Sequence, residues 1–310
     1  MPLQVVGIAC DWGGAQPGGA AGVISWYYLG LHYKHLAWIE ADHYLLRPAD
    51  DLIVWLSTGS HVYARRLESW VGFAEEVRRQ VSMLSLDRRT LFLTGDHSWA
   101  GVILPVLAEK FPEIGVIWID AHADLHNPAT SPSGNLHGMA LALATGLNRH
   151  RYHPIPEATW EIWERQVKAA IPPQNLLFVG LRSYEPPEME IIHSHNIVHF
   201  TSEVLMKEGM EAAIQAAYAL AERCGVLYVS FDVDVWDPSF APGTGSPAVG
   251  GLSIAHLRVF LDRVLSWSAT RFVEITEINP LLDRENHTAM YAYGTVRSFI
   301  DGIEACSSLE

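Results

Sequence analysis

Short hydrophobic runs alternate along the chain with longer segments that carry hydrophobic residues at helical spacing. The runs are continuous and rich in Val, Ile, Leu or Phe, which is typical of strands buried on both faces of a sheet. They predict strands at Gln4–Ala9, Thr90–Leu93, Val116–Ile119, Leu176–Val179, Val226–Phe231 and Arg271–Ile275. Helices are predicted between them, notably at His61–Val81, Met206–Arg223 and Ile254–Trp267. This alternation predicts an α/β fold with a largely parallel central sheet.

No internal repeat and no low-complexity linker interrupts this pattern, so we expect a single domain over residues 1–310. One stretch differs from the rest. Asn148–Pro173 is rich in Trp, His and Pro, and we interpret it as an excursion on the surface. Its Trp-rich part, His150–Trp163, is compatible with an interface, a pocket lid or simple packing.

Composition and charge narrow the class of protein. The net charge of −14 argues against nucleic-acid binding, which needs clustered Lys and Arg. No run approaches the roughly 18 apolar residues of a membrane-spanning helix, and the N-terminal residues do not follow a secretory signal pattern. Cys10, Cys224 and Cys306 are widely spaced, so a disulfide framework is not expected. We therefore expect a cytoplasmic protein without a membrane or nucleic-acid partner.

Polar clusters directly follow three of the predicted strands. Val116–Ile119 is followed by DAHAD, Val226–Phe231 by DVD, and Thr90–Leu93 by TGDH. In parallel α/β sheets, ligands bind beyond the carboxyl ends of the strands. The candidate ligands at these ends are His97, Asp120, His122, Asp124, Asp232 and Asp234.

These residue types indicate a site for two metal ions. Asp120, His122 and Asp124 would project from one face if the chain stays extended, because residues two apart then point the same way. Carboxylates crowded in this way repel one another unless cations intervene. A single DxD is usually a solvated loop or a helix cap, and a lone His97 is more often structural, but the combination favours metal binding. The mixed set suits Mn²⁺, and Co²⁺, Ni²⁺, Fe²⁺ or Zn²⁺ also accept it.

Two such ions can share a bridging water and lower its pKa enough to supply hydroxide near neutral pH. Hydrolysis also needs a group that holds the electrophilic carbon and a group that carries protons. His137, Glu277 and the turn Ser133–Asn135 are candidates for these roles. Alone, Glu277 would be read as an ordinary charge at a strand end and His137 as a helix cap.

Five segments, in this order along the chain, resemble the ureohydrolase family, which includes arginase and agmatinase. They are TGDHS (Thr94–Ser98), DAHADLH (Asp120–His126), SGNLHGM (Ser133–Met139), SFDVDVWDPSFAPGTGSP (Ser230–Pro247) and EINP (Glu277–Pro280). The resemblance implies a three-layer α/β/α fold of the arginase type with two Mn²⁺ ions. It also implies a small guanidino substrate, release of urea, and assembly into a homo-oligomer, either a trimer or a hexamer.

The resemblance further implies a role for each residue of the site. His97 and Asp124 would bind one ion, His122 and Asp232 the other, and the two remaining acids, Asp120 and Asp234, would bridge. A metal-bridging hydroxide would attack the guanidino carbon. Asp124 would be a catalytic residue as well as a metal ligand. Glu277 would pair with the planar guanidinium, as carboxylates do through two hydrogen bonds. His137 would carry protons, because its side chain titrates near neutrality.

The segment SGNLHGM separates the candidate substrates. In arginases it supplies hydroxyl and amide groups for the α-carboxylate of the amino acid, and Ser133 and Asn135 supply them here. Ser246 is a further candidate substrate contact. The resemblance therefore favours arginase, which converts L-arginine to L-ornithine and urea.

The chain differs from many arginases at the rim of the expected pocket. Ser183 replaces an acid associated with the α-amino group, and His126 stands where many arginases have Asn. Glu185 and Glu188 are candidates for contacting an ammonium group, although both are equally compatible with solvated loop acids. These differences leave the guanidino substrate open.

Three alternatives to arginase activity remain. The nearest is another ureohydrolase, such as agmatinase, guanidinobutyrase or formimidoylglutamase. A non-catalytic family member is less favoured, because the ligands, Glu277 and His137 are all present. A two-metal phosphatase is disfavoured, because no Gly-rich phosphate loop or cluster of Arg and Lys accompanies the ligands.

Overall fold

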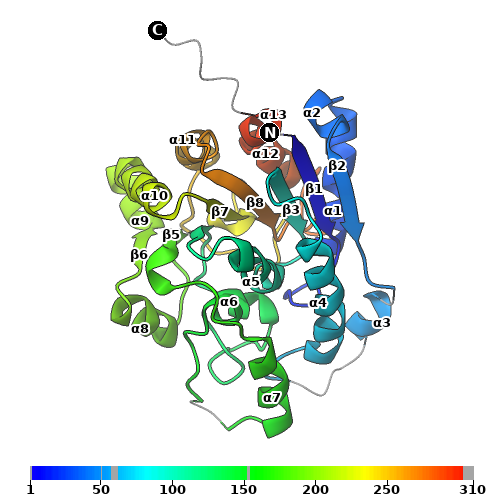
Figure 1. Cartoon of the computed structure of the whole chain (residues 1–310), viewed down its shortest axis with the longest axis vertical. Helices are drawn as coiled ribbons and strands as arrows, with labels where there is room; N and C mark the ends of the chain where they lie inside the picture. The colour runs from blue at the N-terminus through cyan, green and yellow to red at the C-terminus, as the bar shows by residue number, and fades with distance from the viewer. Residues whose placement is uncertain (1, 50, 57–61, 152–153, 303–310) are drawn as a thin grey trace.

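A computed structural model describes residues 2–49, 51–56, 62–151 and 154–302. Within these residues, eight strands form one parallel sheet in the order β2-β1-β3-β8-β7-β4-β5-β6 (Figure 1). The strands are β1 (Leu3–Ile8), β2 (Asp42–Leu46), β3 (Arg89–Thr94), β4 (Gly115–Ile119), β5 (Leu176–Leu181), β6 (Val198–Thr201), β7 (Leu227–Asp232) and β8 (Thr270–Thr276).

Helices connect the strands, as parallel pairing requires. They are α1 (Gly19–His32), α2 (Leu36–Ile39), α3 (Asp51–Leu56), α4 (Leu67–Ser82), α5 (Ala100–Lys110), α6 (Ala140–Thr145), α7 (Glu157–Gln166), α8 (Pro186–Ser194), α9 (Ser202–Glu208), α10 (Glu211–Cys224), α11 (Ile254–Val264), α12 (His287–Thr295) and α13 (Arg297–Asp301). Short 3₁₀ turns are η1 (His97–Trp99), η2 (Leu136–Met139), η3 (Pro173–Asn175) and η4 (Val233–Val235). None of the helices in the described part of the chain is long and apolar enough to span a membrane.

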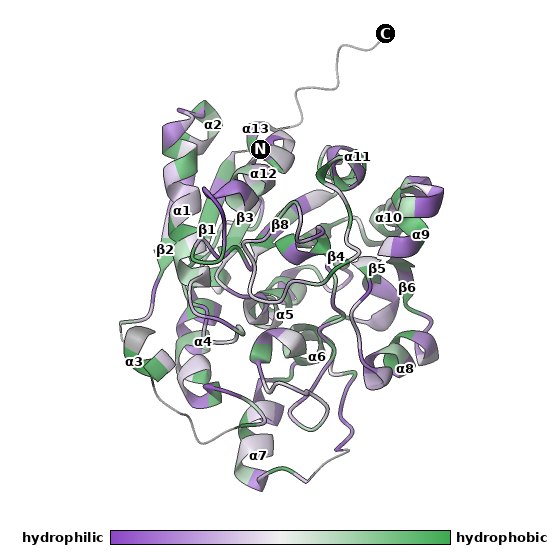
Figure 2. Cartoon of the chain, turned by 180° about the vertical axis from the view of Figure 1, so that it is seen from behind, coloured by the Kyte–Doolittle hydropathy of each residue, from purple (hydrophilic) through white to green (hydrophobic). Residues whose placement is uncertain are grey.

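The sheet is the middle of three layers, because its two faces enter separate hydrophobic clusters. On β4, Val116 and Trp118 pack into the cluster with α4, α5 and α6. Ile117 and Ile119 alternate with them and pack into the cluster with α1, α10, α11 and α12. The outer helices α10 and α11 carry both hydrophilic and hydrophobic residues, as helices with one buried face do (Figure 2). The expected three-layer α/β/α fold is confirmed.

All six predicted strands are present, and the two that sequence analysis missed are the edges of the sheet. The edge strands β2 and β6 are partly exposed and include His43 and His199. A strand with one open edge does not need the continuous hydrophobic run that marks a buried strand. These two strands therefore lack the signal on which the prediction depended.

The helix predictions need two corrections. The predicted helix Met206–Arg223 is interrupted at Gly209, whose φ of 86° lies in a region that favours glycine, so α9 and α10 are separate helices. The predicted helix His61–Val81 begins later, at Leu67, and its first residue lies outside the described residues. The third prediction, Ile254–Trp267, corresponds to α11.

The Trp-rich segment contributes to packing. Trp160 and Trp163 of α7 are buried, with their ring centroids 5.4 Å apart, and α7 contacts α4. Residues 152–153 of this segment lie outside the described part of the chain. Of the three interpretations of the segment, the buried tryptophans support simple packing.

Candidate metal centre

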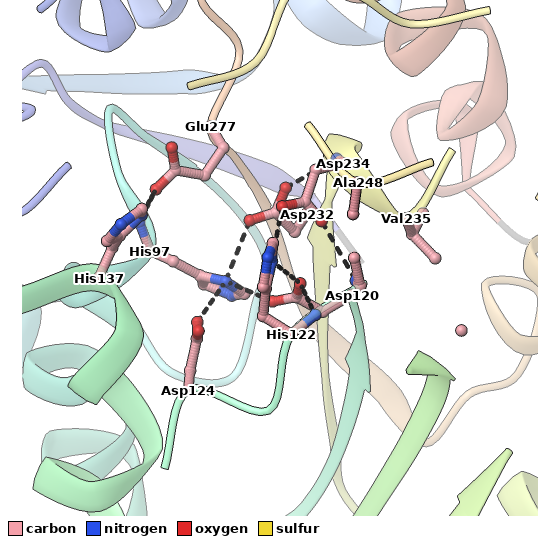
Figure 3. A network of polar contacts seen from close by, with 12 residues as sticks. His97, Asp120, His122, Asp124, His137, Asp232, Asp234, Val235, Ala248 and Glu277 are labelled. Carbon is pink, nitrogen blue, oxygen red and sulfur yellow. Dashed lines mark hydrogen bonds and ion pairs between the residues drawn. The ribbon is translucent and has the colours of Figure 1, made fainter. Parts of the chain in front are cut away.

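Polar side chains from the carboxyl ends of four adjacent strands converge at one place (Figure 3). His97 follows β3 in the turn η1, and Asp120 follows β4. Asp232 ends β7, and Asp234 lies in the turn η4. Glu277 follows β8, which lies between β3 and β7. The strand order, rather than closeness in sequence, thus brings these groups together.

The first group of potential ligands surrounds the imidazole of His97. Its Nδ1 lies 3.0 Å from Asp120 Oδ2, 3.1 Å from Asp124 Oδ2 and 3.3 Å from Asp232 Oδ2. The ring stacks on Trp118, with centroids 3.9 Å apart and an interplanar angle of 3°. All four ligand candidates are buried, so their charges are poorly solvated.

A second group shares one carboxylate with the first. His122 Nδ1 lies 2.9 Å from Asp234 Oδ2 and 3.5 Å from Asp120 Oδ1. Both oxygens of Asp120 are therefore used, one toward each histidine. Two ions bridged by Asp120 are the arrangement that these contacts fit.

The local backbone differs from the extended chain expected after Ile119. Asp124 has φ 52°, a left-handed conformation that turns its side chain back toward His97. Asp232 accepts a hydrogen bond from the backbone N–H of Asp234, which starts the turn η4. The convergence was predicted, but for Asp124 and Asp234 it arises from turns and not from strand alternation.

The donor set fits a divalent cation. Among the described residues, His97 Nδ1 and Asp120 Oδ2 are buried polar atoms that no hydrogen bond satisfies, although they lie 3.0 Å apart. Neighbouring ligands of an octahedral ion with bonds of about 2.1 Å are roughly 3.0 Å apart. The spacing of atoms around His97 is that of ligands around a common ion. A bound cation would satisfy these two atoms.

The pKa values of the buried carboxylates also favour a bound cation. Burial, with the nearby charge of Asp120, raises the pKa of Asp124 to about 6. Burial and the neighbouring carboxylates also raise the pKa of Asp232 and of Asp234. Ionising all these groups together is unfavourable without positive charge, and a bound cation would remove that penalty.

The contacts divide the ligands differently from the expected assignment. Asp232 was expected beside His122, and Asp234 as a bridge. Instead, Asp232 groups with His97 and Asp120, whereas Asp234 groups with His122 and Asp120. Asp124 lies 3.1 Å from His97 but belongs to neither of these two groups. All six predicted ligands nevertheless lie in this one cluster.

Glu277, which is buried, pairs with the partly buried His137 beside the cluster. Glu277 Oε1 accepts hydrogen bonds from the backbone N–H of His97 and from His137 Nδ1, both at 3.0 Å. Burial lowers the pKa of His137, but the charge of Glu277 outweighs this and raises the pKa to about 9. Glu277 itself has φ 64°, an uncommon conformation for this residue and one often found at functional sites.

A cavity of about 240 Å³ opens onto the cluster. Its lining comprises Ala15, His122, Asp124, His126, Ser131, Pro132, Ser133, Asn135, His137, Gly138, Glu185, Glu188, Asp232, Asp234 and Ser246. Every predicted substrate-contacting residue is in this lining. Glu277 does not line the cavity, but it contacts His137, which does. The lining contains no Lys or Arg.

Two of the rim residues are bound to each other. His126 Nε2 lies 2.8 Å from Glu185 Oε2 and 3.3 Å from Glu188 Oε2. Glu185 and Glu188 form the capping box at the start of α8. Ser183 does not line the cavity, and its backbone N–H donates to the carbonyl of Ala121. Of the departures noted in the sequence, His126 thus joins the rim through an ion pair, and Ser183 lies outside the cavity lining.

Sequence analysis missed a residue that supports the cluster. The Arg182 guanidinium donates to the carbonyl oxygens of Asp234, Val235 and Ala248, and its backbone N–H donates to Ala121. It thereby joins the loop after β4 to the turn η4. Its position directly after β5, the neighbour of β4, was the available signal.

Comparison with known proteins agrees with the geometry. The model of the Arginase family matches residues 3–301. The chain is 30% identical over 303 residues to the arginase of Bacillus caldovelox, covering 96% of this chain and 97% of the relative. It is 32% identical over 303 residues to that of Brevibacillus brevis, covering 96% of each.

Solved structures give the same result for the fold. The native arginase of Bacillus caldovelox at pH 5.6 superposes with a TM-score of 0.79 at 29% identity, covering 96% of this chain and 98% of that one. The Entamoeba histolytica arginase in complex with L-ornithine has a TM-score of 0.80 at 25% identity, with the same coverage. With nearly the whole chain matched by sequence and by structure, this protein belongs to the arginase family.

Proposed function

We propose that this protein is a metal-dependent amidinohydrolase that converts L-arginine to L-ornithine and urea. One observation carries the proposal: two groups of His and Asp ligands share Asp120 and open, beside His137, onto one cavity. Such an arrangement suits a hydrolase that activates water with two ions. The arginases among its relatives span nearly the whole chain, which supports the same activity.

The six ligand candidates would hold two ions, with Mn²⁺ proposed and other divalent ions acceptable to the same donors. When bound, the ions would lower the pKa of water enough to supply hydroxide, the nucleophile, near neutral pH. This chain's residues do the rest. Trp118 and the surrounding hydrophobic cluster fix the orientation of His97, and Asp120 spaces the two sites.

Glu277 and His137 would act on the substrate. Glu277 Oε1 already accepts from His97 N–H and His137 Nδ1, so Oε2 is the oxygen left to receive a guanidinium N–H. His137 lines the cavity, and its raised pKa keeps a proton available. That proton is suited to the amine that leaves when the C–N bond breaks.

The opposite rim favours a substrate with a carboxylate. Ser133 Oγ accepts a hydrogen bond from the backbone N–H of Asn135, so its own O–H is left to donate. Ser133 and Asn135 both line the cavity. Neutral donors of this kind can hold the α-carboxylate of an amino acid, whereas agmatine offers no carboxylate to them.

A second candidate is a guanidino-acid hydrolase whose substrate lacks the α-amino group. It is favoured by one contact, the 2.8 Å pair between His126 and Glu185, which occupies the acid otherwise available to an ammonium group. Guanidinobutyrate is such a substrate. Agmatine and formiminoglutamate complete the set of alternatives.

We also propose that residues 1–310 form a single domain, that the protein is cytoplasmic and that it is a homo-oligomer, either a trimer or a hexamer. All strands of the described residues belong to one sheet, which supports a single domain. Size-exclusion chromatography with light scattering measures the oligomer; a monomer at every concentration would contradict that part of the proposal.

The test of the catalytic proposal is urea release. Protein loaded with Mn²⁺ is assayed with arginine, agmatine, guanidinobutyrate and guanidinopropionate, and formamide release from formiminoglutamate is measured in parallel. We expect urea from arginine, and none after chelation. Urea from guanidinobutyrate alone would favour the second candidate, and no product from any of these compounds would refute both.

A further inference from the structure

Glu274 is a carboxylate buried in the middle of the sheet, beneath the candidate metal centre. It lies on β8, opposite Ser230 on β7 and Phe92 on β3, and is 0% exposed. Its partners are hydroxyl groups: Thr94 Oγ1 is 2.8 Å from Oε1, and Tyr228 Oη and Ser230 Oγ are 2.8 Å and 2.7 Å from Oε2. Burying a polar group costs free energy unless hydrogen bonds compensate it, and here three hydroxyl groups do so.

Glu274 is linked to His97 by two consecutive hydrogen bonds through Ser230, and both have a fixed direction. Ser230 donates its one hydroxyl proton to Glu274 Oε2, so that proton is not free for His97. The oxygen of Ser230 is then left as the acceptor for His97 Nε2, which lies 2.7 Å away. Nε2 must therefore carry the proton, and in a neutral imidazole Nδ1 is left with its lone pair.

That lone pair points to the place where a ligand is needed. His97 Nδ1 faces the carboxylates of Asp120, Asp124 and Asp232 and forms no hydrogen bond of its own. Stacking on Trp118 fixes the plane of the ring, and Ser230 fixes its rotation within that plane. The opposite tautomer would place a proton on Nδ1, where it would exclude a cation.

We propose that Glu274 is a positioning residue that, through Ser230, sets the tautomer of His97 so that Nδ1 is the metal ligand. The inference rests on the metal role proposed above for His97. Glu274 itself touches neither ion nor substrate. Its Oε2 lies 3.8 Å from His97 Nε2, and the Ser230 proton, which it accepts, transmits its effect on the tautomer. Groups that orient a metal-bound histidine commonly change metal affinity by about 10- to 100-fold.

Variants of the network separate this role from a merely structural one. Glu274→Leu removes the acceptor and frees the Ser230 proton to point at Nε2, so we expect Mn²⁺ affinity at one of the two sites to fall about 100-fold. Glu274→Gln keeps one of the two acceptor oxygens, so we expect a fall of about tenfold. Tyr228→Phe is the matched control. It removes a hydroxyl group that donates to the same Oε2, but this hydroxyl does not reach His97. We expect it to bind both ions with less than about threefold change.

Calorimetric titration of the metal-free proteins with Mn²⁺ measures these affinities, and circular dichroism verifies folding. If Glu274→Leu does not fold, the comparison of Glu274→Gln with Tyr228→Phe still decides. Equal affinity in these two variants, or wild-type affinity in Glu274→Gln, would overturn the inference.

The tautomer has its own spectroscopic signature. Protein labelled with ¹⁵N in the histidine rings and loaded with diamagnetic Zn²⁺ should show His97 with a protonated Nε2 and a metal-bound Nδ1. The signal is assigned by its loss in Ser230→Ala, which should perturb Nε2. A protonated Nδ1 in the wild type would refute the inference while leaving a two-metal enzyme intact. Wild-type protein that binds no metal, or binds it equally well in His97→Ala, would instead refute the proposed function.

Discussion

The clamp formed by Arg182 supports a quantitative prediction. Its guanidinium donates to the carbonyl oxygens of Asp234 at 2.5 Å, Ala248 at 2.8 Å and Val235 at 3.1 Å. It thereby holds the turn η4, which carries one of the ligand candidates for the second ion. Arg182→Met keeps most of the apolar length of the side chain and removes the donors.

The expected loss follows from these three contacts. Hydrogen bonds from a charged donor contribute about 1.5–3 kcal/mol each, so three at the low end amount to about 4.5 kcal/mol. Removing the partly buried guanidinium also removes its desolvation cost, which offsets part of this loss. We therefore expect the free energy of unfolding to fall by about 3–4 kcal/mol, which at about 2 °C per kcal/mol corresponds to a Tm lower by about 6–8 °C.

Thermal unfolding of metal-free and Mn²⁺-loaded protein measures this change. The control is Arg258→Met, because Arg258 is exposed and pairs with Asp262 at 3.4 Å, a contact expected to contribute less than about 1 kcal/mol. We expect Arg182→Met also to weaken the site that contains Asp234 more than the site that contains His97. A Tm and metal content equal to those of Arg258→Met would refute the clamp.

Three further predictions concern the site itself. Glu277→Gln keeps an acceptor for His97 N–H, so metal content should be unchanged while kcat for urea release falls by about 10²- to 10⁴-fold; full activity would exclude Glu277 from the chemistry. Asn135→Ala should raise KM for arginine about tenfold and leave agmatine turnover unchanged, and equal effects on both substrates would contradict a carboxylate contact. Metal-free protein should lose stability as pH rises: the folded-state pKa of Asp124, raised to about 6, gives a loss between about pH 4 and pH 6. Burial lowers the pKa of His97, but the neighbouring carboxylates outweigh this and raise it. His97 therefore adds a loss of stability above its unfolded pKa of about 6.5. The gap in Tm between Mn²⁺-loaded and chelated protein should therefore widen from about pH 5 to about pH 8, and a narrowing gap would contradict the assignment.

Much of the site could be predicted from the sequence, because its residues directly follow strands that the hydrophobic pattern identifies. The motif that contains Asp120 and His122 directly follows a buried strand, and in a parallel sheet such ends lie at one edge. The convergence of the six candidate ligands could be predicted on this ground. Their division between two ions could not, because it depends on which carboxylate lies beside which imidazole.

Backbone conformation and strand order set the limit of the prediction. Nothing local to Asp124 indicates its positive φ, which is maintained by tertiary contacts such as the backbone bonds from Leu141 and Ala142 to its carbonyl. The role of Glu274 depends on β8 lying between β3 and β7, although β8 comes last in the sequence. Edge strands β2 and β6 were missed for the related reason that their exposure removes the hydrophobic run.

The central claim is that two ions held by one shared cluster perform hydrolysis of a guanidino group. Its most direct test is a titration in which metal-free protein receives increasing Mn²⁺ while bound metal and urea release from arginine are measured on the same samples. We expect binding to saturate at two ions per chain and urea release to rise until both are bound, with Asp120→Asn lowering both quantities. Full activity at one bound ion, or no urea at full occupancy with any guanidino compound, would contradict the account.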